Sequence, residues 1–213
     1  MKSTKWIALL FSCSLVSAIG GTSERDGKSS SGRTATRLTT PFDQGKLELQ
    51  SASGAYLSVG HSDQPNINYT STAYRLGIML YTPSGDGILR GNCELMLQLG
   101  YGSIFNGPGN YVASGAAILR YNFVQPEAKW VPYVQIGAGM AYNDIYKDDR
   151  EQSLVGQAWL INLEATVGVR YFFNDRWSAN LEGGYRHQSN VDENRRNIGL
   201  NSLGGGVGLG YHF

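Results

Sequence analysis

Strict alternation of apolar and polar residues constrains this chain more than any other feature. From Trp177 to Tyr185 the odd positions carry mostly apolar residues, while the even positions carry Ser, Asn, Glu and Gly. Successive side chains of a β-strand point to opposite faces, so this stretch predicts a strand with one apolar and one polar face. The segment 203–213 repeats the pattern and ends on an aromatic residue. Such alternation along a whole chain is typical of a sheet whose outer face meets lipid.

Eight segments show the pattern, which is the strand number of the smallest outer-membrane barrels. They are 47–59, 74–81, 94–101, 117–123, 130–142, 161–173, 177–189 and 203–213. The first is the weakest, because its alternation slips near Ser51–Gly54, where we expect a β-bulge. The sequence therefore predicts an all-β fold over residues 46–213, an eight-stranded antiparallel transmembrane β-barrel.

The composition agrees with a barrel and excludes several other classes. Only 16% of the residues are charged, and the mean hydropathy is −0.27, because every second barrel residue faces inward. After the leader, no segment approaches the roughly 18 continuous apolar residues of a membrane-spanning helix. The formal net charge is +1 without a basic stripe, so we expect no nucleic-acid partner.

The inward positions of the predicted strands carry several charged residues. An eight-stranded barrel is only wide enough for side chains to fill. We therefore expect a packed core of ion pairs rather than a channel, which excludes a general diffusion porin. The inward residues are Arg75, Arg120, Glu164, Arg170, Glu182 and Arg186.

The N-terminal residues 1–18 have the features of a secretory signal peptide, with two lysines, an apolar run and small residues before a cut after Ala18. Residues 19–45 are polar and aperiodic, which predicts a flexible periplasmic segment. A lipoprotein acylation site at Cys13 is the alternative for the leader. If the leader is removed together with Cys13, Cys93 is a lone thiol. Export and a barrel together predict the outer membrane of a Gram-negative bacterium.

The predicted connections differ in length. Asn174–Asp175 joins two strands tightly, whereas 143–156 and 190–200 are long and polar. Long loops belong outside the cell in such barrels, which predicts that the residues around 187–201 lie at the extracellular rim.

His187 and Ser189 are two residues apart in the lipid-facing phase, with Cα atoms roughly 6 to 7 Å apart. A serine hydroxyl beside an imidazole is the pairing that a base-activated nucleophile needs. Asn201 has the same parity, and pairing of Ser189 with Asn201 would place all three side chains on one external patch. A purely structural interpretation also stands, because polar residues near the membrane interface cost only about 0–1 kcal/mol.

The segments Arg186–Asn190 and Asn197–Ser202, with the closing strand to Phe213, resemble the PagL family of outer-membrane lipid A 3-O-deacylases. The resemblance covers roughly 47–213 and includes the Pro132–Tyr133 strand. It implies an esterase that removes the hydroxyacyl chain at the 3 position of lipid A, with lipopolysaccharide in the outer leaflet as its partner. It also implies that Ser189 is the nucleophile, His187 the base and Asn190 the oxyanion donor.

One position departs from the family pattern. The family's archetype carries a glutamate about a dozen residues after the serine, and this chain has Asn201 there. An amide oxygen can accept the imidazole N–H, but it offers no negative charge, and the wrong tautomer costs about 10⁴ in the serine proteases. The role of Asn201 is therefore open.

The alternative function is a non-catalytic small barrel that acts through its external loops as a structural or surface-interaction protein. A periplasmic lipoprotein-like β-protein is a third interpretation. The sequence shows no cluster spaced to hold a metal, and the esterase needs no cofactor. Whether the barrel forms a homodimer is left open.

Overall fold

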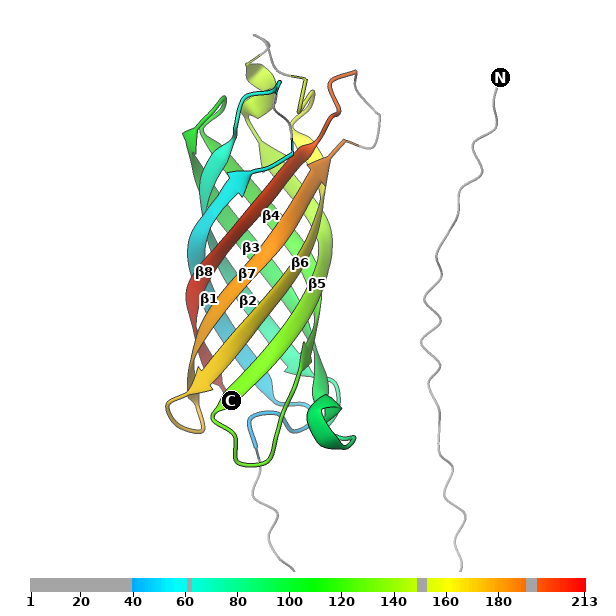
Figure 1. Ribbon diagram of the computed structural model, residues 1–213, viewed down its shortest axis with the longest axis vertical. Coiled ribbons are helices and arrows are strands. Elements are labelled where there is room, and N and C mark those ends of the chain that lie inside the picture. The colour runs from blue at the N-terminus through cyan, green and yellow to red at the C-terminus, as the bar shows by residue number, and fades with distance from the viewer. Residues whose placement is uncertain (1–39, 61–62, 149–152, 191–194) are drawn as a thin grey trace, which may run out of the picture. The chain divides into compact units, whose positions relative to one another are not determined.

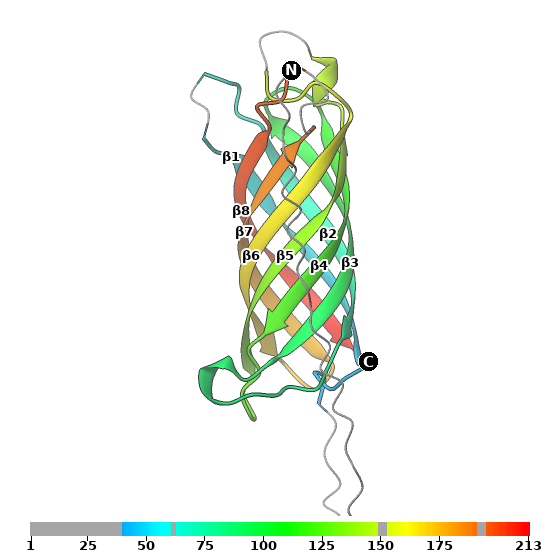
Figure 2. The same ribbon diagram turned by 90° about the vertical axis from the view of Figure 1, so that its right-hand side faces the viewer.

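The structure is a computed structural model, and it describes residues 40–60, 63–148, 153–190 and 195–213. Within these residues the strands form one closed antiparallel barrel, in which each strand pairs with the next and β1 pairs with β8 (Figures 1 and 2). The predicted eight-stranded barrel is confirmed. The predicted signal peptide lies outside the described residues. The strands are β1 (Leu47–Ser58), β2 (Asn68–Met79), β3 (Asn92–Asn106), β4 (Tyr111–Asn122), β5 (Trp130–Asn143), β6 (Trp159–Phe172), β7 (Trp177–Ser189) and β8 (Leu200–His212).

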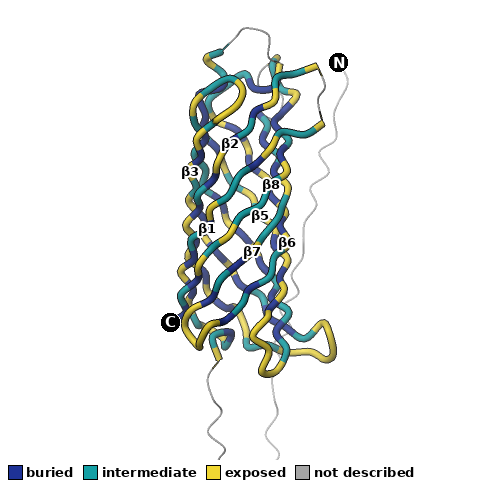
Figure 3. The backbone as a smooth tube through the Cα atoms, turned by 60° about the vertical axis from the view of Figure 1, so that its left-hand side comes forward, coloured by how far each residue is buried: buried dark blue, intermediate teal, exposed yellow. Residues whose placement is uncertain are grey.

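Burial alternates along the strands, as the tube in Figure 3 shows. On β3 the side chains of Leu97 and Leu99 are 68% and 72% exposed, whereas Met96 and Gln98 beside them are each 1% exposed. An exposed apolar band of this kind far exceeds what a soluble monomer shows and fits a hydrocarbon surrounding. In the part of the chain that is described, no helix is both long and apolar enough to cross a membrane.

Aromatic side chains gather towards both ends of this band. We call the end where β7 ends and β8 begins the outer end, and the opposite end the inner end. The outer aromatic belt comprises Tyr101, Tyr111, Tyr142, Trp159 and Tyr185. The inner aromatic belt comprises Tyr121, Phe123, Trp130, Tyr171, Phe173, Trp177, Tyr211 and Phe213. Such belts mark the two membrane interfaces of an outer-membrane barrel.

The barrel interior is filled by ion pairs, as predicted. Arg75 donates to both carboxylate oxygens of Glu182 at 2.7 and 2.8 Å. Glu48 and Glu94 are also buried inside the barrel, although they are not among the inward charged residues predicted from the sequence. A pocket in the interior beside Arg75 and Glu182 has a volume of only about 10 Å³, room for about one water. The predicted inward residues are confirmed in place: Arg75, Arg120, Glu164, Arg170, Glu182 and Arg186.

Several strands extend further towards the outer end than the sequence pattern predicted. β2 begins at Asn68 and β4 at Tyr111, each six residues before its predicted start. The inward positions here include Tyr69 and Val112, which are buried in an apolar cluster. The faces still alternate, but the outward residues at the start of β2 are Asn68, Thr70 and Thr72, so the apolar outward pattern does not continue there.

The predicted β-bulge near Ser51–Gly54 is wrong. The pairing of β1 with β2 and with β8 runs through these residues without a shift. Ser51 takes an outward position and Ala52 a buried one. Here the outward residue is polar and the buried residue is apolar, the reverse of the residues before them, while the strand pairing continues unchanged. The register shift instead lies between Asn68 and Tyr69, where β2 meets β3.

The connections follow the predicted lengths only in part. Phe173 donates its backbone N–H to Trp177 O at 3.0 Å, which closes the predicted tight turn at Asn174–Asp175. At the inner end, however, residues 80–91 form a long connection that contains the 3₁₀ helix η1 (Gly87–Leu89). At the outer end, residues 107–110 form a short one. Long connections are therefore not confined to one end.

The flexible segment was predicted to reach residue 45, but its last residues close the inner end of the barrel. Phe42 is 4% exposed, and its ring contacts Phe172 edge-on with the centroids 5.4 Å apart. The Asn92 side chain donates to Phe42 O at 2.8 Å. Residues 40–46 therefore belong to the folded barrel.

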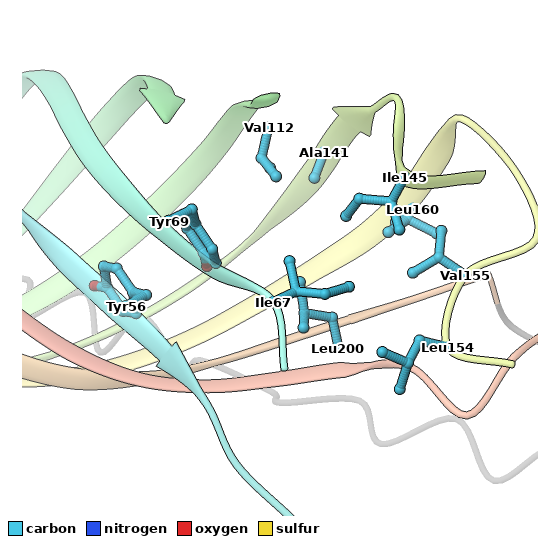
Figure 4. Close-up of a cluster of buried hydrophobic side chains, with 10 residues drawn as sticks. All are labelled: Tyr56, Ile67, Tyr69, Val112, Ala141, Ile145, Leu154, Val155, Leu160 and Leu200. Atoms are coloured by element: carbon cyan, nitrogen blue, oxygen red, sulfur yellow. The ribbon is translucent and has the colours of Figure 1, made fainter. Parts of the chain in front are cut away.

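An apolar cluster closes the outer end (Figure 4). Leu154 and Val155 come from the β5–β6 connection, and Leu200 begins β8. The same connection contains the 3₁₀ helix η2 (Ile145–Lys147), whose Ile145 is buried in the cluster. This outer apolar cluster anchors the loops that surround the end of β7. Its members are Tyr56, Ile67, Tyr69, Val112, Ala141, Ile145, Leu154, Val155, Leu160 and Leu200.

Candidate active site

His187 and Ser189 occupy the last outward positions of β7. Both are partly exposed, whereas Arg186 and Gln188 on either side of the histidine are buried. They share the phase of Leu181, which is 60% exposed on the apolar band. Both side chains therefore point away from the barrel interior, towards the surface that the alternation assigns to lipid.

The height of the pair on the barrel follows from the register with β6. Ser189 pairs with Ile161. Two residues further towards the outer end of β6 is Trp159, whose ring packs edge-on against Tyr142 with centroids 5.0 Å apart. Ser189 thus lies at the level of the outer aromatic belt, where a membrane changes from hydrocarbon to headgroups.

Asn201 lies directly opposite His187, because the two residues pair across β7 and β8. The predicted pairing of Asn201 with Ser189 is wrong by two residues, since β8 begins at Leu200 opposite Gln188. A shift of two keeps Asn201 on the outward face. As a result His187 Nδ1 and Asn201 Oδ1 are 2.7 Å apart, a short hydrogen bond.

This hydrogen bond determines which imidazole nitrogen carries the proton. An amide oxygen only accepts, so His187 donates from Nδ1. The neutral ring then has an unprotonated Nε2, which is the nitrogen that can take a proton from a hydroxyl. Tyr185 donates its hydroxyl to the same Asn201 Oδ1 at 2.6 Å.

Gly199 brings the β7–β8 connection close to the two candidate catalytic side chains. Its φ is +84°, a conformation that favours glycine. A Cβ at this position would lie 3.1 Å from His187 Cε1 and 3.5 Å from Ser189 Cβ. The imidazole ring and the serine side chain therefore flank the same point, beside a backbone that leaves room for both.

Asn190 follows Ser189 and is buried, with 3% exposure. Its backbone N–H donates to Asn197 Oδ1 at 2.9 Å, and its side-chain amide donates to Arg196 O at 3.1 Å. An amide group has two N–H donors, and the bond to Arg196 O uses one of them. The nearby backbone N–H groups of Ile198 and Gly199 donate to Ser153 O and Leu154 O. They are therefore already used.

The β5–β6 connection supports the loop that carries these residues. Arg196 donates to Tyr146 O at 3.1 Å and to Asp148 O at 3.3 Å. Together with the two backbone bonds from Ile198 and Gly199, this joins the β7–β8 loop to the outer apolar cluster. The position of the candidate site thus depends on a loop more than thirty residues away in sequence.

Asp144 fixes the start of the β5–β6 connection. Its carboxylate accepts the backbone N–H groups of Asn110 at 2.7 Å and Tyr111 at 3.1 Å, and the Asn110 side-chain amide at 2.7 Å. Burial acts to raise the pKa of the Asp144 carboxyl, but these hydrogen bonds favour the charged form and hold its pKa below the usual value.

We expect Asp144→Ala to loosen the outer loops in a pH-dependent manner. A carboxyl whose pKa is lowered by folding stabilises the structure above its unfolded pKa, about 4, and loses that effect as the pH falls through the folded pKa. At neutral pH the variant should be cleaved in 144–158 about 5-fold faster, the scale of one hydrogen bond. Limited proteolysis with a neutral and an acid protease measures this. A difference from wild type that persists unchanged at pH 2 would contradict the assignment.

An apolar groove runs along the outer surface below the site, with a volume of about 630 Å³. It crosses six strands, from Cys93 on β3 to Leu203 on β8. Gly183 and Gly184 lie in it, so its floor on β7 is backbone. Tyr185 lines the groove with its ring, while its hydroxyl reaches Asn201. The groove therefore leads to the hydrogen-bonded group that contains His187.

The family described as "Lipid A 3-O-deacylase (PagL)" matches residues 68–210. The chain belongs to this family. Its closed barrel and the family together indicate the outer membrane, with lipid as the surrounding medium. The matched range includes all four predicted site residues, His187, Ser189, Asn190 and Asn201.

The chain is also similar to several solved structures. The chain is similar to Neisserial surface protein A (NspA), with TM-score 0.55 and 13% identity over 80% of this chain and 100% of that chain. It is similar to the outer membrane enzyme PagL, with TM-score 0.47 and 20% identity over 78% and 98%. The N-terminal barrel of Pseudomonas aeruginosa OprF gives TM-score 0.47 and 18% identity over 80% and 98%. No curated protein matches the chain.

Two residues that shape the candidate site could not be recognised from the sequence pattern. Tyr185 counted only as an aromatic at the edge of the band, although its hydroxyl contacts Asn201. Gly199 stood out only as part of a motif, although it lies against both His187 and Ser189. Both contacts depend on the register of β7 with β8. Among the described residues, no group of His, Cys, Asp and Glu is arranged to hold a metal.

Proposed function

We propose that this barrel hydrolyses the ester that links a hydroxyacyl chain to the 3 position of lipid A, with Ser189 as nucleophile and His187 as base. The observation that carries the proposal is the position of His187. It faces outward two residues before Ser189, and its Nδ1 is 2.7 Å from Asn201 Oδ1. Membership of the lipid A 3-O-deacylase family supports the substrate. The outward orientation supports attack on a substrate that stays in the membrane.

In the proposed first step, His187 Nε2 takes the Ser189 hydroxyl proton while Oγ bonds to the ester carbonyl carbon. The resulting tetrahedral intermediate collapses and breaks the bond to the sugar oxygen. That oxygen receives the proton from Nε2. A water molecule then attacks the acyl-serine while His187 Nε2 takes its proton. The bond from the acyl carbon to Oγ breaks, Oγ receives the proton back from Nε2, and the hydroxy fatty acid is released. Throughout, Asn201 Oδ1 accepts a hydrogen bond from Nδ1–H of the ring, which keeps the proton on Nδ1 and holds the tautomer that these steps need.

Asn201 supplies the ring with an acceptor but no charge. The positive imidazolium that forms in each step is therefore stabilised by a dipole instead of a carboxylate. Hydrogen bonds between a charged and a neutral group still contribute about 1.5–3 kcal/mol. We propose that Asn201 fills the family's glutamate position as an orienting acceptor, with a lower rate than a carboxylate would give.

The oxyanion donor in this proposal is the Asn190 side chain, because the neighbouring loop N–H groups already have acceptors. One of its two amide hydrogens bonds Arg196 O, which fixes the group in place. In the proposal the second amide hydrogen donates to the negative oxygen, because a donor already held in place stabilises that charge strongly.

Asn190→Ala is expected to lower the deacylation rate constant about 10²- to 10³-fold, the usual effect of removing one oxyanion donor. The Michaelis constant should change little, because the donor acts mainly on charge that develops in the transition state. Steady-state kinetics with lipid A in detergent micelles measures both. Asn68→Ala, on the outer end of β2, is the matched control. A variant with higher Michaelis constant and unchanged rate constant would show that Asn190 binds the substrate instead.

Mass spectrometry of lipid A from cells that express the chain tests the function itself. The proposal predicts loss of one hydroxyacyl chain from the 3 position and a matching free 3-hydroxy fatty acid, with the amide-linked chains intact. Cells that make a Ser189→Ala variant should keep that chain. Unchanged lipid A in cells with a folded wild-type barrel, checked by its heat-modifiable migration on gels, would favour the non-catalytic barrel.

A further inference from the structure

The acceptor of the histidine in this site is an amide, and an amide has two chemically different ends. With Oδ1 towards His187, the ring keeps its proton on Nδ1 and Nε2 is free. With the amide turned by 180°, Nδ2 would donate to Nδ1, and the proton would move to Nε2. The ring could then accept nothing from Ser189, and the wrong tautomer costs about 10⁴ in the serine proteases. A site built on Asn201 therefore needs something that selects one orientation.

From the geometry we infer that Tyr185 is this positioning residue, because its hydroxyl holds Asn201 Oδ1 towards His187. The inference rests on the proposed function. The hydroxyl oxygen lies 2.6 Å from Oδ1, and His187 Nδ1 lies 2.7 Å from the same atom. An amide oxygen has two lone pairs and can accept both donors. A phenol donates strongly and accepts weakly, since its oxygen lone pair is delocalised into the ring. Tyr185 therefore favours the oxygen over the NH₂ group at this point.

The strand geometry explains why Tyr185 can reach Asn201. His187 pairs directly with Asn201, and Tyr185, two residues earlier on the same face, pairs with Leu203. Tyr185 and Asn201 are thus diagonal neighbours across β7 and β8, a spacing that aromatic side chains span. The Tyr185 ring lies beside Leu203 in the apolar groove. The ring lies along the groove while its hydroxyl contacts Asn201.

Tyr185 selects the orientation of the Asn201 amide, and this selection would not be needed if a carboxylate accepted the hydrogen bond from His187. A carboxylate has two equivalent oxygens, so it presents an acceptor to Nδ1 in either orientation. We therefore expect Tyr185 to matter in the Asn201 background and to matter much less when Asn201 is replaced by aspartate, which has the same size and shape.

The first test is a double-mutant cycle of Tyr185→Phe and Asn201→Asp with lipid A in micelles. Tyr185→Phe alone should lower the rate constant about 10-fold, the scale of one hydrogen bond, with little change in Michaelis constant. In the Asn201→Asp background the same change should cost about 2-fold or less. Tyr74→Phe, a lipid-facing tyrosine on β2, should leave the rate unchanged. An equal loss in both backgrounds, or a loss in Michaelis constant alone, would overturn the inference.

The second test reads the tautomer directly and does not need hydrolysis. In ¹⁵N-histidine-labelled protein, the His187 signals, assigned by their absence in His187→Gln, should report protonated Nδ1 in wild type. In Tyr185→Phe they should report a mixture of the two tautomers, and Tyr74→Phe should match wild type. Identical His187 signals in wild type and Tyr185→Phe would overturn the inference. If the tautomer shifts but wild type leaves lipid A intact, the proposed function fails and the positioning role of Tyr185 stands.

Discussion

Ser189→Ala is expected to lower the rate of lipid A deacylation by about 10⁴- to 10⁶-fold, the range found when a serine nucleophile is removed from a hydrolase. The physical reason is that no acyl-serine can form, so hydrolysis needs a direct attack by water. The barrel should fold normally, because Ser189 is the partly exposed last residue of β7 and no core contact is lost. Release of 3-hydroxy fatty acid from lipid A in micelles measures the rate.

Ser103→Ala is the matched control for this experiment. Ser103 is also an exposed serine near the outer end of a strand, on β3 in the phase of Tyr101. It pairs with Tyr111 on β4 and takes no part in the site. Its replacement should leave the rate unchanged. A Ser189→Ala variant with more than about one tenth of the wild-type rate would show that another group attacks the ester.

His187→Ala has the second-largest expected effect, a loss of about 10⁴-fold or more. Without the ring no group takes the serine proton. The hydrogen bond from the Tyr185 hydroxyl to Asn201 Oδ1 should remain. The same fatty-acid release assay measures it. Heat-modifiable migration should match wild type, since the side chain lies outside the barrel core.

The double variant His187→Ala with Ser189→Ala separates a catalytic unit from two independent contributors. Residues that act as one unit are strongly non-additive, so the double variant should be no slower than Ser189→Ala alone. Rate losses that multiply would mean that the two residues contribute independently, for example through substrate binding, and would exclude the base–nucleophile pair.

The alternation predicted the barrel wherever the interior is polar. Along β7, Arg186 and Gln188 alternate with outward residues, and the observed faces match the pattern. The pattern failed at the outer ends of β2 and β4, where the inward residues Tyr69 and Val112 are apolar. On β2 the outward residues there are Asn and Thr, so the polarity of the two faces is reversed. It also failed at Ser51, where a small polar residue faces outward and mimics a bulge.

The sequence pattern predicted which face of the sheet each candidate site residue occupies, but it did not predict which side chains contact one another. Parity alone places His187, Ser189 and Asn201 on one face, and the structure agrees with that. Which residues touch depends on the register of β7 with β8, which the loop fixes through Gly199 and through Arg196. These contacts involve the β5–β6 connection, far away in sequence. The hydrogen bond between His187 and Asn201, and the role of Tyr185, therefore became visible only in three dimensions.

In the proposed mechanism His187 activates Ser189 on the membrane-facing surface. A long-chain alkyl fluorophosphonate is a direct probe of this activation, because such reagents phosphonylate a serine that has an activating base. After incubation with the folded barrel, peptide mass spectrometry should find the adduct on Ser189 in wild type and in Ser103→Ala, and no adduct in His187→Ala. An adduct on another residue with Ser189 unmodified, or equal labelling of Ser189 without His187, would contradict the account.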